Sequence, residues 1–139
     1  MNQTTEVNEI NNFIKNKEIS EINLYRFEND KLTITGSKDN IYYHNMELIF
    51  TNPAYISGPL SFQISENCEF IEEVPLTQVS NWPIFSDSDI PLRAFSMRSS
   101  EGPPLTIAAE RLETNTDMVY HYNREKLKEN ERLAYWLIK

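Results

Sequence analysis

The sequence predicts an α+β fold, with a mainly antiparallel curved sheet or partly open barrel of about six to eight strands and a helix at the N-terminus. Three observations lead to this class. Residues 5–16 carry apolar side chains at helical spacing, residues 22–35 pair face to face as a hairpin, and residues 60–65 alternate strictly between apolar and polar. Short turns separate the strand-like segments, and short turns favour antiparallel order because parallel strands need long crossovers.

The N-terminal helix is expected over residues 5–16. Val7 and Ile14 fall on one face of such a helix, and Thr4 or Thr5 is placed to cap its N-terminus. Acidic side chains precede basic ones along the segment. This order suits the helix dipole and supports the prediction.

The hairpin over residues 22–35 turns at Asn29 and Asp30, two residue types that tolerate positive φ. The predicted register places Glu28 opposite Lys31, next to the turn. On the apolar face it pairs Phe27 with Leu32 and Tyr25 with Ile34. On the other face it pairs Arg26 with Thr33 and Leu24 with Thr35. Residues expected to be buried are Phe27, Leu32, Ile34, Leu48, Phe62 and Ile64, and residues expected to be more exposed are Arg26, Thr33, Ser61 and Gln63.

Further strands are expected at residues 41–50, 55–56, 60–65, 92–98, 105–109 and 118–122. Residues 66–91 show no sustained period and are expected to form a long connection. The stretch 108–112 has a helical alternative by propensity. Residues 124–138 have two interpretations, a second helix capped by Asn123 at the C-terminus or a buried strand.

The charge of the chain is regional. Between Lys38 and Arg93 there is no lysine or arginine, whereas the acids there are Asp39, Glu47, Glu66, Glu69, Glu72, Glu73, Asp87 and Asp89. These acids account for the whole formal charge of -8. Such a field attracts cationic partners and repels phosphate and anionic lipid, so a basic protein partner is expected, and neither nucleic acid nor a membrane.

An aromatic patch lies inside this acidic region. Trp82 and Phe85 stand between two acidic clusters, as an apolar anchor with a charged rim, although a loop that covers one end of the core has the same composition. The predicted partner-binding residues are Glu66, Glu69, Glu72, Glu73, Trp82, Phe85, Asp87 and Asp89.

Motifs for catalysis or metal binding are not found in the sequence. His44, Cys68 and His121 lack the close spacing of a zinc site, and Glu66 and Glu69 disfavour a Cys68 thiolate. Neither a glycine-rich phosphate loop, a nucleophile elbow nor an HExxH helix is present, and Asp87 and Asp89 lack the glycine and glutamate of a calcium loop. We therefore expect no cofactor and no metal.

The length of 139 residues suits one globular domain over residues 1–139. The N-terminus lacks the pattern of a secretory signal, no apolar run approaches the roughly 20 residues of a membrane span, and Cys68 has no disulfide partner in the chain. A soluble cytoplasmic protein is expected, and an edge strand offers a route to a homodimer.

The leading functional hypothesis is a non-enzymatic protein-binding domain, such as an inhibitor or immunity-type protein that covers a basic groove on a nuclease or other toxin. The alternative is a curved-sheet protein that binds a small apolar or aromatic ligand, with tyrosines and Trp136 lining a cavity. A third and weaker hypothesis is a small hydrolase or isomerase that uses His44 or His121.

Overall fold

The computed structural model describes residues 4–64, 69–78 and 91–138. The helices and strands in these segments are α1 (Thr5–Lys17), β1 (Glu21–Glu28), β2 (Lys31–Ser37), β3 (Tyr43–His44), β4 (Met46–Thr51), β5 (Tyr55–Ser57), β6 (Ser61–Gln63), β7 (Ile71–Val74), η1 (Leu76–Gln78), β8 (Arg93–Met97), β9 (Leu105–Ala109), β10 (Arg111–Asn115), β11 (Met118–Tyr120), β12 (Glu131–Leu133) and η3 (Tyr135–Leu137).

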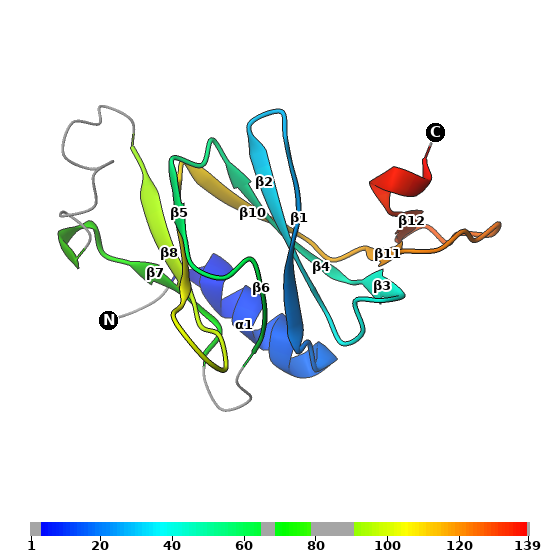
Figure 1. Cartoon of the computed structure of the whole chain (residues 1–139), viewed down its shortest axis with the longest axis horizontal. Helices are drawn as coiled ribbons and strands as arrows, with labels where there is room; N and C mark the ends of the chain where they lie inside the picture. The colour runs from blue at the N-terminus through cyan, green and yellow to red at the C-terminus, as the bar shows by residue number, and fades with distance from the viewer. Residues whose placement is uncertain (1–3, 65–68, 79–90, 139) are drawn as a thin grey trace.

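The strands form three sheets. A five-stranded sheet has the order β10-β4-β2-β1-β6, a four-stranded sheet the order β5-β9-β8-β7 and a three-stranded sheet the order β12-β11-β3. Among the described strands, every pair is antiparallel except β11 with β12. The predicted α+β class with antiparallel sheets is therefore confirmed, and none of the sheets formed by the described strands closes into a barrel. Figure 1 shows the three-stranded sheet and the C-terminus together at one end of the molecule.

The N-terminal helix forms as predicted. Thr4 is the N-cap and its side chain accepts a hydrogen bond from the Val7 N–H, while Glu18 ends the helix in the left-handed conformation at φ 54°. The buried side chains of α1 include Asn11, whose amide bonds both the carbonyl and the N–H of Ile71 in β7. Asn11 thereby joins α1 to the four-stranded sheet.

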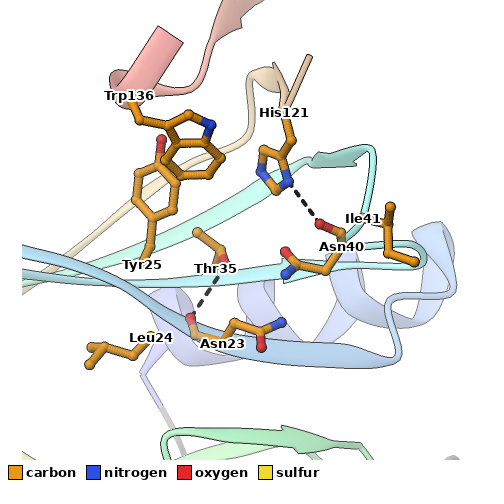
Figure 2. Close-up of a pocket in the computed structure, with 8 residues that line it drawn as sticks. All are labelled: Asn23, Leu24, Tyr25, Thr35, Asn40, Ile41, His121 and Trp136. Carbon is orange, nitrogen blue, oxygen red and sulfur yellow. Dashed lines mark hydrogen bonds between the residues drawn. The ribbon is translucent and has the colours of Figure 1, made fainter.

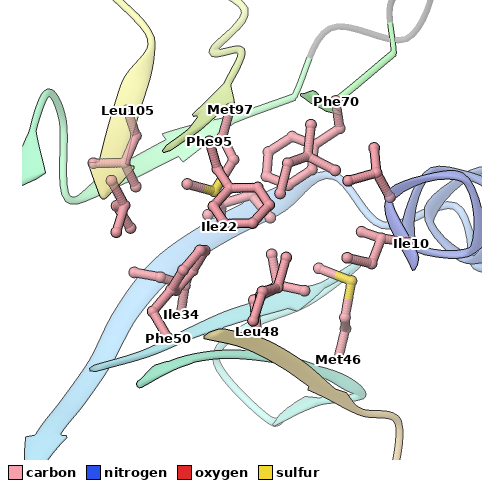
Figure 3. Packing of buried hydrophobic residues seen from close by; sticks show 14 of the residues in the cluster. Ile10, Ile22, Ile34, Met46, Leu48, Phe50, Phe70, Phe95, Met97 and Leu105 are labelled. Atoms are coloured by element: carbon pink, nitrogen blue, oxygen red, sulfur yellow. The ribbon is translucent and has the colours of Figure 1, made fainter. Parts of the chain in front are cut away.

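The hydrophobic core lies between the five-stranded and four-stranded sheets, with α1 closing one side (Figure 3). Its largest fully buried apolar side chains are Phe50, Phe70, Phe95, Ile22, Ile34, Met46, Leu48, Ile71, Met97, Leu105 and Ile107. Of the residues predicted to be buried, Leu32, Ile34 and Leu48 are buried and Phe62 and Ile64 are partly buried. Ser61 and Gln63 are exposed, as predicted.

The predicted hairpin forms, but its register shifts in β1. Asn29 and Asp30 make the turn at positive φ, and the pairs next to the turn are those predicted. Between Leu24 and Arg26 a bulge inserts Tyr25, so Leu24 rather than Tyr25 pairs with Ile34. The predicted pairs of Tyr25 with Ile34 and of Leu24 with Thr35 are therefore wrong.

Two predictions about the faces of this hairpin are also wrong. Phe27 is 65% exposed, because it lies near the hairpin end, beyond the three residues of β1 that pair with β6. Thr33 is buried, because β2 lies in the interior of the five-stranded sheet and its second face is covered as well, whereas Arg26 is half-buried and thus more exposed than Leu32, as predicted. The alternation of β2 therefore does not separate a buried face from an exposed one.

Residues 66–91 were predicted to form a connection, yet they contain β7, which pairs with β8. The sequence of this strand, Ile71-Glu72-Glu73-Val74, places two acids together and hides the alternation that identifies strands. The strand is stabilised by a residue distant in the sequence, because Arg93 of β8 forms an ion pair with the Glu73 carboxylate at 2.7 Å.

Of the two interpretations of residues 124–138, the second helix is not formed. Asn123 caps no helix, residues 124–130 are irregular, and the short strand β12 and the 3-10 helix η3 follow. Contacts with distant residues favour the extended conformation of this segment. Arg132 donates to Glu47 and Asp117, and the Glu131 carboxylate accepts from the Tyr120 hydroxyl. These contacts outweigh helical side-chain pairs, which contribute only about 0.2–0.5 kcal/mol each.

Candidate functional site

The candidate site lies where the three-stranded sheet meets the five-stranded sheet. In β4, Met46 and Leu48 face the hydrophobic core, so the intervening Glu47 points to the opposite face. There Glu47 meets His44 of β3 and Arg132 of β12, and His121 follows β11 directly. Four different segments of the chain thus contribute to one polar cluster.

A chain of hydrogen bonds runs through this cluster. His121 Nδ1 lies 2.8 Å from the Asn40 carbonyl oxygen, and His121 Nε2 lies 2.8 Å from His44 Nδ1. His44 Nε2 lies 2.8 Å from Glu47 Oε2, and the second oxygen of Glu47 accepts from Arg132 at 2.7 Å. His44 is completely buried and Glu47 is 5% exposed, so solvent does not satisfy these groups.

The partners fix where the protons are. The Asn40 carbonyl can only accept, so His121 Nδ1 carries a proton, and the contact between His121 Nε2 and His44 Nδ1 needs one proton between them. An ionised Glu47 also requires a proton on His44 Nε2. Two imidazoles then share three protons, and the pair carries one positive charge beside the Glu47 carboxylate.

Electrostatics support this assignment. Burial raises the pKa of Glu47, but hydrogen bonds from His44 and Arg132 outweigh it, so the pKa lies below the ordinary 4.5. Burial lowers the pKa of His121 below the ordinary 6.5, the Asn40 carbonyl opposes this shift, and positive charge on His44 adds to it. The lowered pKa of His121 therefore favours the neutral form of this ring at pH 7.

Beside this cluster is a groove, which we define as two adjoining pockets of about 340 and 460 Å³ that share Asn23, Asn40 and Ile41. Figure 2 shows Tyr25, His121 and Trp136 around the first pocket. The second pocket adds Glu21 and residues of β6. No lysine or arginine lines either pocket among the described residues.

Aromatic rings form one wall of the groove. The Tyr25 ring lies 5.1 Å from the Tyr135 ring and 5.7 Å from the Trp136 ring, and Trp136 lies 5.2 Å from His121. Trp136 is 49% exposed and Ile41, across the groove, is 77% exposed. Burial raises the pKa of Tyr25, partly offset by the Tyr135 N–H that donates to its hydroxyl, so Tyr25 stays protonated at neutral pH.

The acidic residues predicted to bind a partner are only partly described. Glu69 pairs with Lys15 at 2.7 Å, and Arg93 links Glu73 at 2.7 Å to Glu6 of α1 at 3.1 Å. Cations from outside the acidic segment thus offset two of these acids. Glu72 is exposed. The predicted residues Glu66, Trp82, Phe85, Asp87 and Asp89 lie outside the described residues, and their role stays a prediction.

The histidine cluster could not be recognised from the sequence. His44 and His121 are 77 positions apart and each is flanked by ordinary strand residues, so only the fold brings them together. Within residues 4–64, 69–78 and 91–138, no group of three or more His, Cys, Asp and Glu side chains is arranged to hold a metal ion. In the observed arrangement both nitrogens of both imidazole rings have hydrogen-bond partners, so neither ring offers a nitrogen to a substrate.

Comparison with protein-family models, with curated proteins and with solved structures finds no match to this chain. In the part of the chain that the structure describes, no helix has both the length and the apolar character needed to cross a bilayer. A functional assignment therefore depends on the groove and the polar cluster beside it.

Proposed function

We propose that this protein is a non-enzymatic protein-binding domain and that its partner docks on the groove. The observation that carries the proposal is that three exposed apolar side chains line one groove, namely Leu24, Ile41 and Trp136. Tryptophan and tyrosine concentrate binding energy at protein interfaces because they bury a large area with few rotatable bonds.

The charge of the groove favours a basic partner. Glu21 contributes a carboxylate to the lining, and its Oε2 accepts from the Asn40 N–H while Oε1 has no hydrogen bond to another described residue. Asn40, Ile41 and the β6 residues belong to the segment of the chain without lysine or arginine. A basic side chain with an apolar stem matches this combination of carboxylate and aromatic ring. An inhibitor or immunity-type protein that covers a basic surface is the function this supports best.

The test uses three immobilised baits, the wild-type chain, Trp136→Ala and Ile56→Ala. Ile56 is a matched control, since it is 42% exposed but lies in the four-stranded sheet, away from the groove. We expect a basic protein to be retained by wild type and Ile56→Ala and lost from Trp136→Ala, with dissociation faster by about tenfold or more for a hot-spot residue. Equal retention by all three folded baits would contradict the groove as the docking site.

The acidic strip is tested with the same partner. Glu72→Lys reverses an exposed charge in β7 without touching the groove. If the predicted strip from Glu66 to Asp89 steers a basic partner, this variant associates more slowly and its association depends less on salt. An unchanged association rate would restrict the interface to the groove.

A small apolar or aromatic ligand is the second candidate, favoured by the pocket of about 340 Å³ between Tyr25, His121 and Trp136. This volume is within the range of small-molecule sites, roughly 300–1,000 Å³. Indole is a suitable probe, and the measurement is the NMR shift of the Trp136 indole N–H during its titration. Saturable shifts without any protein partner would favour the ligand over the protein.

A further inference from the structure

We propose that the His44–His121 pair controls the shape of the groove through its charge, and we call this pair the latch. While the pair carries a single positive charge, His121 holds the groove lining at Asn40 and Trp136 in place. When a second proton binds in acidic solution, the two rings repel each other and this lining is released. The consequence for partner binding rests on the proposed function, but the latch itself does not.

The latch follows from the contact between the two rings. Nitrogens 2.8 Å apart accommodate one proton, which one ring donates and the other accepts. When both rings are imidazolium ions, two N–H groups face each other and the contact is repulsive. His44 is completely buried and bound to Glu47, whereas His121 is half-buried beside the groove. His121 is therefore the ring that moves.

Among the described residues, no carboxylate is hydrogen-bonded to His121, and the acids nearest the pair already have other partners. Glu47 of β4 offsets the charge on His44, while Asp117 and Glu47 hold Arg132 of β12. Glu21 of β1 is bonded to the Asn40 N–H, and Tyr25, also of β1, presents a protonated phenol whose ring lies 4.7 Å from His44. A second imidazolium would therefore stay in place only at the cost of an uncompensated charge.

Movement of His121 changes the groove, because its ring ties two lining elements together. Its Nδ1–H donates to the Asn40 carbonyl next to Ile41, and its ring packs against Trp136 (Figure 2). Burial holds the pKa of His121 below its ordinary 6.5, so the second proton binds in mildly acidic solution and the latch stays closed at neutral pH.

The first test is nitrogen-detected NMR of the imidazole rings in the full-length chain. At about pH 7.5 we expect one ring to be neutral with its proton on Nδ1 and the other to be doubly protonated. Acidification should then titrate the neutral ring alone. Two neutral rings at this pH would overturn the proposal, and so would two rings that titrate independently. This measurement needs no histidine substitution, so a variant that fails to fold cannot obscure it.

The second test reports movement of the wall. Trp82→Phe leaves Trp136 as the sole tryptophan of the chain, and its fluorescence is followed from about pH 7.5 to about pH 4.5. We expect a transition below pH 6.5 that disappears when His121→Gln is added, since glutamine can still donate to the Asn40 carbonyl but does not titrate. A flat titration in Trp82→Phe, or an unchanged transition with His121→Gln, would contradict the latch.

The third measurement connects the latch to binding, with the basic protein retained by the wild-type bait as the probe. If only the closed form binds, the apparent Kd rises about tenfold per pH unit below the His121 pKa, and His121→Gln removes this dependence. If His121 titrates in the free protein but the Kd does not change with pH, the latch does not control binding, and the partner docks elsewhere than on the groove. Failure of the latch in the first two tests would leave the proposed binding function intact.

Discussion

At β2 and β4 the five-stranded sheet buries residues on both of its faces, but by different chemistry. On one face Ile34, Leu48 and Phe50 pack against the four-stranded sheet and α1 in a dry core. On the other face Thr35 and Glu47 lie under the three-stranded sheet in a hydrogen-bonded polar layer. A buried face therefore does not have to be apolar when a second sheet supplies the hydrogen-bond partners.

The difference has an energetic consequence. Apolar burial gains free energy in proportion to area and needs no particular partner, so the dry face provides most of the stability. A buried ion pair gains little over a well-packed apolar group, because desolvation offsets much of the attraction. The contacts among His44, Glu47 and Arg132 therefore act mainly to fix the position of the three-stranded sheet and of the groove beside it.

The largest effect is expected on the dry face. Phe50 is completely buried and its ring lies 5.7 Å from that of Phe95, so Phe50→Ala leaves a cavity between the two large sheets. We expect a loss of about 3–5 kcal/mol in the free energy of unfolding, measured by urea denaturation. Phe27→Ala is the control, because Phe27 is 65% exposed and its truncation should cost less than about 0.5 kcal/mol. Similar costs for the two variants would show that the core does not lie on this face.

The dry face was the more predictable of the two. Helical spacing located α1, the alternation around Leu48 and Phe62 located strands, and Asn29 with Asp30 located the hairpin turn. Each of these signals lies within a few neighbouring residues, and each depends on local backbone preference or on the period of apolar residues. Such features can be predicted without knowledge of the tertiary structure.

The polar face depends on contacts between distant residues and was not predicted. The bulge at Tyr25 leaves no mark in the alternation of β1, yet it brings Tyr25 to His44 and Trp136. Arg132 lies 85 residues from Glu47, and this contact helps to make the C-terminal segment extended rather than helical. Polar residues carry no periodic signal for burial, so the cluster of His44, Glu47 and His121 emerges only from the fold.

The next largest effect is expected at Glu47 on the polar face. Glu47→Gln removes the charge that holds His44 and Arg132 and turns an acceptor oxygen into a donor. Hydrogen bonds to charged groups contribute about 1.5–3 kcal/mol, and we expect a loss of about 2–3 kcal/mol in the free energy of unfolding. Asp117→Asn, at the more exposed end of the cluster, should cost less than about 1 kcal/mol.

The same variant tests the pH dependence of the polar face. The pKa of Glu47 is lowered in the folded protein, so the unfolded chain binds the proton more tightly. The stability that this carboxylate contributes is present above pH 4.5 and is lost as the pH falls through the folded-state pKa. Urea midpoints measured across this range should fall less steeply for Glu47→Gln than for wild type. Parallel curves would mean that Glu47 does not carry the charge assigned to it.

The smallest effect is expected from paired substitutions at neighbouring positions on the two faces. Thr35→Val removes a buried hydroxyl that donates to the Asn23 carbonyl at 3.3 Å, and Ile34→Val removes one methyl group from the dry core. The variants differ little in strand preference, and each should cost about 0.5–1.5 kcal/mol in the free energy of unfolding. Thr35→Val is compared directly with wild type by urea denaturation, because valine fills the same volume and the Asn23 carbonyl loses only a long hydrogen bond. One outcome would separate the two faces, namely that Thr35→Val is more stable than wild type while Ile34→Val is less stable. The polar layer would then reduce the stability of the protein, as expected if this face positions the groove instead of stabilising the core.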